Sequence, residues 1–164
     1  PHKGFKAAPI TQAELEDITF VRSKIESLCL ENAIQNATVK WEGQIISTMY
    51  ELSRLPSIEQ GSSDNIRSEW TETHKRFHEA LVATCDSPWL LKLRETLYAQ
   101  SERYRQFSVP ANRVPRDLNR EHQEIADAVV SKQTDLATAL LRKHLYKTTT
   151  ILMQSSLVNH GTET

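Results

Sequence analysis

The sequence contains few of the residues that make tight turns and covalent cross-links. Only 4 of its 164 residues are glycine and only 2 are cysteine. Scarce glycine disfavours a β-sandwich or barrel, because the tight turns of those folds depend on it. The two cysteines, Cys29 and Cys85, lie far apart in no paired motif. This excludes a disulfide-rich secreted scaffold and is typical of a reducing compartment, where both thiols stay free.

An excess of one charge and long apolar runs are also missing. The formal net charge is −1, whereas domains that bind nucleic acid are usually strongly basic. We therefore expect that this part of the chain does not hold DNA by itself. No run approaches the roughly 18 apolar residues that a membrane span needs, and no signal peptide is visible. The expectation is a cytoplasmic protein with no membrane contact.

A helical pattern covers most of the chain. In the first predicted helix, apolar residues recur at steps of three and four at Leu15, Ile18, Val21, Ile25 and Leu28. Similar stripes and their flanking prolines predict helices over about 11–36, 38–54, 66–85, 88–107, 116–131 and 134–157. Strand-like alternation and internal repeats are absent from the pattern. The length fits one domain, so we expect an all-α fold, an antiparallel bundle of about six to seven helices.

The first residues lack this period. Pro1 to Pro9 include two prolines and a glycine, which predicts a linker or arm over residues 1–10. Thr11 is followed three residues later by Glu14, the spacing of a capping box, and marks the start of the first helix. The predicted organisation is therefore an arm at 1–10, a helical domain at 11–158 and a tail at 159–164.

Four of the six histidines fall on the inward stripes of predicted helices: His74, His78, His122 and His144. His74 and His78 are four residues apart, so both rings project from one helical face. Each could be a core histidine with one satisfied hydrogen bond. Burying four imidazoles without partners would cost roughly 1–3 kcal/mol for each unsatisfied group, and one shared metal would satisfy them all. Imidazole ligands favour Zn, Ni, Co, Fe or Cu over Ca or Mg.

Polar side chains also stand on or beside the apolar stripes. Arg22, with Glu26 four residues on, is either a solvated ion pair at the edge of a stripe or a guanidinium that reaches inward to hold a carboxylate. Gln100 and Tyr104 share one face of the fourth predicted helix, and Arg105 flanks that face. These side chains could bind a small polar ligand or belong to an ordinary core.

Catalytic motifs are poorly represented. The sequence has no G-x-S-x-G elbow, phosphate-binding loop, dinucleotide fingerprint or H-E-x-x-H pair. Glu79 and Glu121 stand beside histidines and could act as a base on metal-bound water, although nothing in their spacing singles out either one. A metal-dependent hydrolase and a structural helical interaction domain therefore remain alternative functions.

The order and spacing of four segments carry a family resemblance. The segments are Val21-Arg22 with Ile25-Glu26, His74 with Phe77-His78 and Leu81, Glu121-His122 with Ile125, and His144-Leu145. The chain resembles the C-terminal effector-binding domain, or FCD domain, of GntR-type transcriptional regulators of the FadR subfamily. Within that group it is most similar to the CsiR-type repressors.

The resemblance implies a metal site and an effector site. The ligands of the metal would be His74, His78, His122 and His144, with His74 standing where most members carry Asp; this favours Zn or Ni. The effector would be a small carboxylate, for example a dicarboxylate such as glutarate. Its contacts would be Arg22, Gln100, Tyr104 and Arg105.

The resemblance also implies a regulator and not an enzyme. DNA would be bound through a winged-helix domain that precedes this chain, and the full protein would act as a homodimer. The near-zero net charge of this chain agrees with DNA binding by a separate domain, because a domain that only senses a ligand needs no basic surface.

Overall fold

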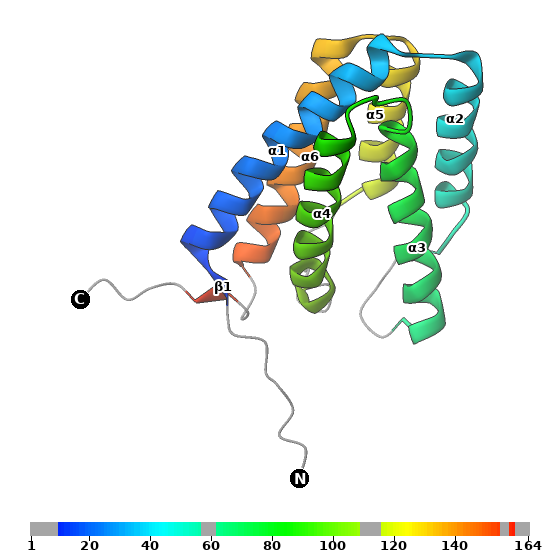
Figure 1. Cartoon of the computed structure of the whole chain (residues 1–164). Helices are drawn as coiled ribbons and strands as arrows, with labels where there is room; N and C mark the ends of the chain where they lie inside the picture. The colour runs from blue at the N-terminus through cyan, green and yellow to red at the C-terminus, as the bar shows by residue number, and fades with distance from the viewer. Residues whose placement is uncertain (1–9, 57–61, 109–115, 155–157, 160–164) are drawn as a thin grey trace.

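A computed structural model describes residues 10–56, 62–108, 116–154 and 158–159, and helices dominate it (Figure 1). The described part contains six helices: α1 (Gln12–Gln35), α2 (Val39–Ser53), α3 (Asp64–Leu81), α4 (Pro88–Ser108), α5 (Leu118–Val130) and α6 (Thr134–Met153). The all-α class is therefore confirmed. Two short strands, β1 (Ile10–Thr11) and β2 (Val158–Asn159), pair in parallel near the two ends of the described chain. Each strand is two residues long, which is too short to show an alternating pattern in the sequence.

Local capping fixes where the helices begin. The Thr11 hydroxyl accepts a hydrogen bond from the Glu14 backbone at 3.1 Å, and the Glu14 carboxylate accepts one from the Thr11 backbone at 3.3 Å. This confirms the predicted capping box. The prediction for the third helix was too long by one turn at its end, because α3 ends at Leu81 and a turn follows it. Val82 and Cys85 lie in that turn and continue the apolar spacing without being helical.

The helices pack as neighbouring pairs. Helix α1 packs against α6 and α4, α2 packs against α3 and α5, and α5 packs against α6 (Figure 1). The centre of the core contains Leu30, Trp41, Ile45, Phe77 and Ile125, each at most 1% exposed. Both cysteines of the described chain are free and buried, as expected. None of the described helices is long and apolar enough to cross a membrane.

The buried face of α1 differs from the predicted apolar stripe. Val21 and Leu28 are 38% and 48% exposed, whereas Arg22 and Glu26 are 9% and 2% exposed. The buried carboxylate of Glu26 has a partner on α4. Arg94 Nε lies 2.9 Å from Glu26 Oε2 and partly compensates the buried charge. Of the two alternatives for Arg22, the structure therefore has the one in which the side chain is buried within the bundle.

Candidate metal centre

Three helices bring the four predicted histidines together. His74 and His78 come from α3, His122 from α5 and His144 from α6, and all four are buried. One nitrogen of each ring lies within 4.8 Å of the corresponding nitrogens of the other three. The Nε2 atoms of His74 and His78 are 3.0 Å apart. The cluster joins residues from His74 to His144, which lie far apart in the sequence and meet only when the chain folds.

The four rings differ in their hydrogen-bond partners. His74 Nδ1 lies 3.3 Å from the Tyr98 hydroxyl, and His144 Nδ1 lies 3.0 Å from Glu121 Oε1. Among the described residues, neither ring nitrogen of His122 has a partner, although this side chain is 0% exposed. An unsatisfied buried polar group costs roughly 1–3 kcal/mol. A metal ion at the cluster would satisfy one of the two His122 nitrogens, so the residues present fit one.

Burial keeps the four rings neutral. It is the largest cause that lowers the pKa of every one of them, and it is reinforced by neighbouring histidines or arginines. For His144, the hydrogen bond with Glu121 opposes the shift but does not cancel it. A neutral imidazole carries a free lone pair, which is the form that binds a metal. The environment therefore prepares four nitrogen donors.

A carboxylate and an arginine support His144 from behind. Arg116 donates two hydrogen bonds to Glu121, from Nε at 2.8 Å and from Nη2 at 2.9 Å. It also donates to the backbone carbonyl of His144 at 3.2 Å. Burial raises the pKa of Glu121, but the hydrogen bonds from His144 and Arg116 outweigh it and hold that pKa well below its usual value. An ionised Glu121 can only accept, so His144 Nδ1 donates.

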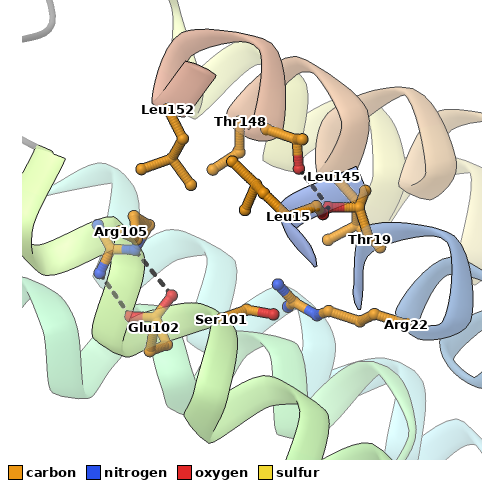
Figure 2. Close-up of a pocket in the computed structure, with 10 residues that line it drawn as sticks. Leu15, Thr19, Arg22, Ser101, Glu102, Arg105, Leu145, Thr148 and Leu152 are labelled. Atoms are coloured by element: carbon orange, nitrogen blue, oxygen red, sulfur yellow. Dashed lines mark hydrogen bonds and ion pairs between the residues drawn. The ribbon is translucent and has the colours of Figure 1, made fainter. Parts of the chain in front are cut away.

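A pocket lies between α1, α4 and α6. Figure 2 shows the side chains that surround it, with Arg22 and Arg105 entering from different helices. Its lining consists of Leu15, Thr19, Arg22, Ser101, Glu102, Arg105, Leu145, Thr148, Thr149 and Leu152. Two of the four predicted effector contacts, Arg22 and Arg105, are thus part of it. Gln100 and Tyr104 are not among these lining residues, and they hydrogen-bond to each other at 2.8 Å.

The charges around Arg22 are incompletely balanced. Its Nε lies 3.6 Å from Glu26 Oε1, and within the described chain it has no hydrogen-bond partner. The other oxygen of Glu26 belongs to Arg94, whose own Nη2 likewise lacks a partner in the resolved bundle. Two buried guanidinium groups therefore share one carboxylate. Such a site favours an additional anion, because buried donors and charges need partners.

Sequence reasoning missed the polar inner face of α4. It named Gln100, Tyr104 and Arg105 on that helix, whereas the structure buries Arg94, Tyr98 and Glu102. Leu93, beside Arg94, is 47% exposed. The three buried side chains are spaced at four-residue steps and share one helical face. The four-residue spacing is visible in the sequence, but polar residues at that spacing usually lie on the solvent-facing side of a helix.

The fold and the site define an all-helical effector-binding domain. Residues 17–147 match the family model of the FCD domain, and the chain belongs to that family. It is 31% identical over 161 residues to the HTH-type transcriptional repressor GlaR of Escherichia coli (strain K12), covering 96% of this chain and 72% of that protein. It is 28% identical over 156 residues to the HTH-type transcriptional regulator BphR of Paraburkholderia xenovorans (strain LB400). That match covers 95% of this chain but only 64% of BphR.

Two solved structures share the fold. One is a GntR-family transcriptional regulator from Pseudomonas syringae pv. tomato str. DC3000, with a TM-score of 0.74 and 20% identity, over 93% of this chain and 61% of that one. The other is the metal-free FCD domain of TM0439, with a TM-score of 0.64 and 18% identity, over 87% of this chain and 94% of that one.

Proposed function

We propose that this chain is the ligand-sensing domain of a GntR-type transcriptional regulator, in which a histidine-bound metal and nearby arginines bind a small carboxylate. The observation that carries the proposal is the state of His122. Its ring is fully buried beside three other histidines, and none of the described residues satisfies either nitrogen. A structural core would favour an apolar side chain at this position.

The donor set suits a borderline transition metal. His74, His78, His122 and His144 offer only nitrogen, which suits Zn or Ni better than Ca or Mg. A bound metal would supply a Lewis-acidic position for a carboxylate oxygen. On the protein side, Glu121 and Arg116 orient His144 so that its Nε2 keeps the free lone pair.

Arg22 is the chain's main group for the ligand. It lines the pocket from α1, and burial strengthens its attraction for an anion by excluding water. Its field also reaches the histidines, because after burial and neighbouring rings it contributes to the lowered pKa of His78. Pocket and histidine cluster are thus electrostatically coupled, and a carboxylate between them would satisfy Arg22.

The hydrolase alternative loses its candidate bases. Glu121 is committed to Arg116 and His144. The Glu79 side chain is 51% exposed and pairs with Lys75 on the outer face of α3. Neither carboxylate is available beside the cluster to activate water. The relatives GlaR and BphR are transcriptional regulators, which agrees with a sensor and not an enzyme.

The regulatory output requires a DNA-binding domain. We propose that the full protein contacts DNA through a winged-helix domain, as a cytoplasmic homodimer on a two-fold operator, and that this chain supplies the sensing part. A ligand alters DNA affinity only to the extent that it binds one arrangement of the protein better than another. The pocket between α1, α4 and α6 is suited to this, because a ligand there contacts three helices at once.

The proposal is tested by metal analysis and ligand binding on untagged protein. We expect about one Zn or Ni ion per chain, and a lower melting temperature after EDTA. In the metal-loaded protein, at least one carboxylate of three to six carbons should raise the melting temperature, and Arg22→Gln should abolish that rise.

Lys24→Gln is the matched control, because Lys24 is an exposed cation on the same helix. It should leave the ligand response unchanged. A protein that holds no transition metal and melts identically with EDTA would refute the metal site. A metal-loaded protein that responds to none of the acids would refute the carboxylate site.

A further inference from the structure

Glu102 and Arg105 form a complete ion pair inside the wall of the pocket. Arg105 Nε donates to Glu102 Oε1 at 2.7 Å, and Arg105 Nη2 donates to Glu102 Oε2 at 2.6 Å (Figure 2). The two side chains are only 15% and 11% exposed. This parallel, two-bond arrangement is the one by which an arginine recognises the carboxylate of a ligand. Glu102 therefore occupies, from within the chain, the place of a ligand carboxylate.

The second arginine of the pocket is in a different state. Arg22 has no such two-bond partner among the residues described, and its Nε lies 3.6 Å from the nearest Glu26 oxygen. A first anionic group at Arg22 therefore displaces no carboxylate from a two-bond pair. A second anionic group in the pocket would pair with Arg105, but Arg105 is already paired with Glu102.

Arg105 would keep its position if Glu102 moved away. Its guanidinium carbon lies 4.9 Å from the centre of the Trp70 ring, a cation–π contact that is independent of Glu102. Trp70 is itself stacked on His74, with ring centroids 4.4 Å apart and planes 16° apart. The arginine is thus held from its aromatic side, while Glu102 is the partner that can be exchanged.

We infer that Glu102 is an internal competitor for Arg105 and determines the specificity of the pocket. This inference rests on the proposed carboxylate-sensing function. A ligand with one carboxylate binds with the Glu102–Arg105 pair intact. A ligand with two carboxylates binds by displacing Glu102 from Arg105. The negative charge of Glu102 therefore lowers the affinity for dicarboxylates much more than the affinity for monocarboxylates.

The experiment compares two acids of equal chain length, glutarate and pentanoate, by titration calorimetry on the Zn-loaded chain. In Glu102→Gln, glutarate should bind about tenfold more tightly or better, since a charge-assisted pair becomes available to it. Pentanoate should change less than about threefold. In Arg105→Gln, glutarate should bind no more tightly than pentanoate, because its second carboxylate has lost its cation.

The control is Glu95→Gln, which removes an exposed carboxylate from the same helix and should affect neither acid. The double variant Glu102→Gln/Arg105→Gln removes the pair without leaving a lone buried charge. It should bind both acids equally, and thermal melts identify any variant that fails to fold.

Equal changes for the two acids in Glu102→Gln, or weaker binding of glutarate, would overturn the competitor role while leaving the carboxylate sensor standing. Zn-loaded protein that binds neither acid in any variant would overturn the competitor role and the carboxylate sensor together.

Discussion

Glu121 holds His144 in one tautomer. The two side chains meet at 3.0 Å, between Glu121 Oε1 and His144 Nδ1. Because Glu121 is ionised and also receives two hydrogen bonds from Arg116, the proton lies on His144 Nδ1. The lone pair is then on Nε2, the ring nitrogen left for a metal.

Replacing Glu121 with Gln should weaken metal binding about 10- to 100-fold, the usual effect of losing a carboxylate behind a metal-binding histidine. Competition between the protein and a chromophoric chelator measures this affinity. Glu124→Gln is the control, because Glu124 lies on the same helix and pairs with Arg120 at the surface. Equal metal affinity in both variants would show that Glu121 does not position His144.

His122→Leu should separate folding from metal binding. In the metal-free protein this substitution removes two unpartnered polar atoms from the core, so the free energy of unfolding should stay constant or rise by about 1–3 kcal/mol. The stabilisation that Zn adds should be largely lost. Denaturant titrations with and without Zn measure both quantities, and Gln123→Leu, at an exposed neighbour, is the control. Undiminished Zn stabilisation in His122→Leu would contradict the four-histidine site.

The buried pair of Glu26 and Arg94 should be costly to break. Glu26→Gln leaves the guanidinium groups of Arg22 and Arg94 without their shared carboxylate, and we expect a loss of about 3–5 kcal/mol. Glu51→Gln provides the comparison, since Glu51 and Arg76 also pair at 2.8 Å but are about half exposed. Its cost should be about 0–1 kcal/mol. Similar losses in the two variants, measured by urea denaturation, would contradict the role given to burial.

Stability of the metal-free protein should fall in mild acid. Burial lowers the pKa of all four cluster histidines below the ordinary value of 6.5. Below about pH 6.5 the unfolded chain therefore binds protons that the folded chain does not, and the free energy of unfolding decreases with decreasing pH. Each histidine contributes at most about 1.4 kcal/mol per pH unit. Denaturation between about pH 7.5 and pH 5 measures the slope, and a flat profile would contradict neutral buried rings.

Local sequence patterns predicted most of the helices and several of their ends. The capping box at Thr11 and two of the flanking prolines, Pro56 after residues 38–54 and Pro88 at the start of 88–107, placed three helix boundaries close to those observed. Local chemistry decides these positions, because a cap or a proline acts within a few residues. The end of α3 was misplaced, since Val82 and Cys85 are buried by tertiary contacts in a turn and extend the apolar spacing beyond the helix.

The candidate site divides in the same way. Periodicity put His74, His78, His122 and His144 on inward faces, and the structure gathers all four. The hydrogen-bond and ion-pair partners of the buried polar side chains could not be predicted from the sequence, because the partners lie far away along the chain. Glu26 meets Arg94 from another helix, and His144 meets Glu121 from another.

The sequence by itself determined the helices, the boundaries set by caps and prolines, and the inward placement of the four histidines, since each depends on contacts within a few turns of one helix. The tertiary structure decided which polar groups face each other, because hydrogen bonds and ion pairs depend on sub-ångström positions set by packing between helices. It turned the polar side of α1 inward against Arg94 and joined Arg116 to Glu121 and His144. It also brought the Glu102–Arg105 pair of α4 into the same pocket as Arg22.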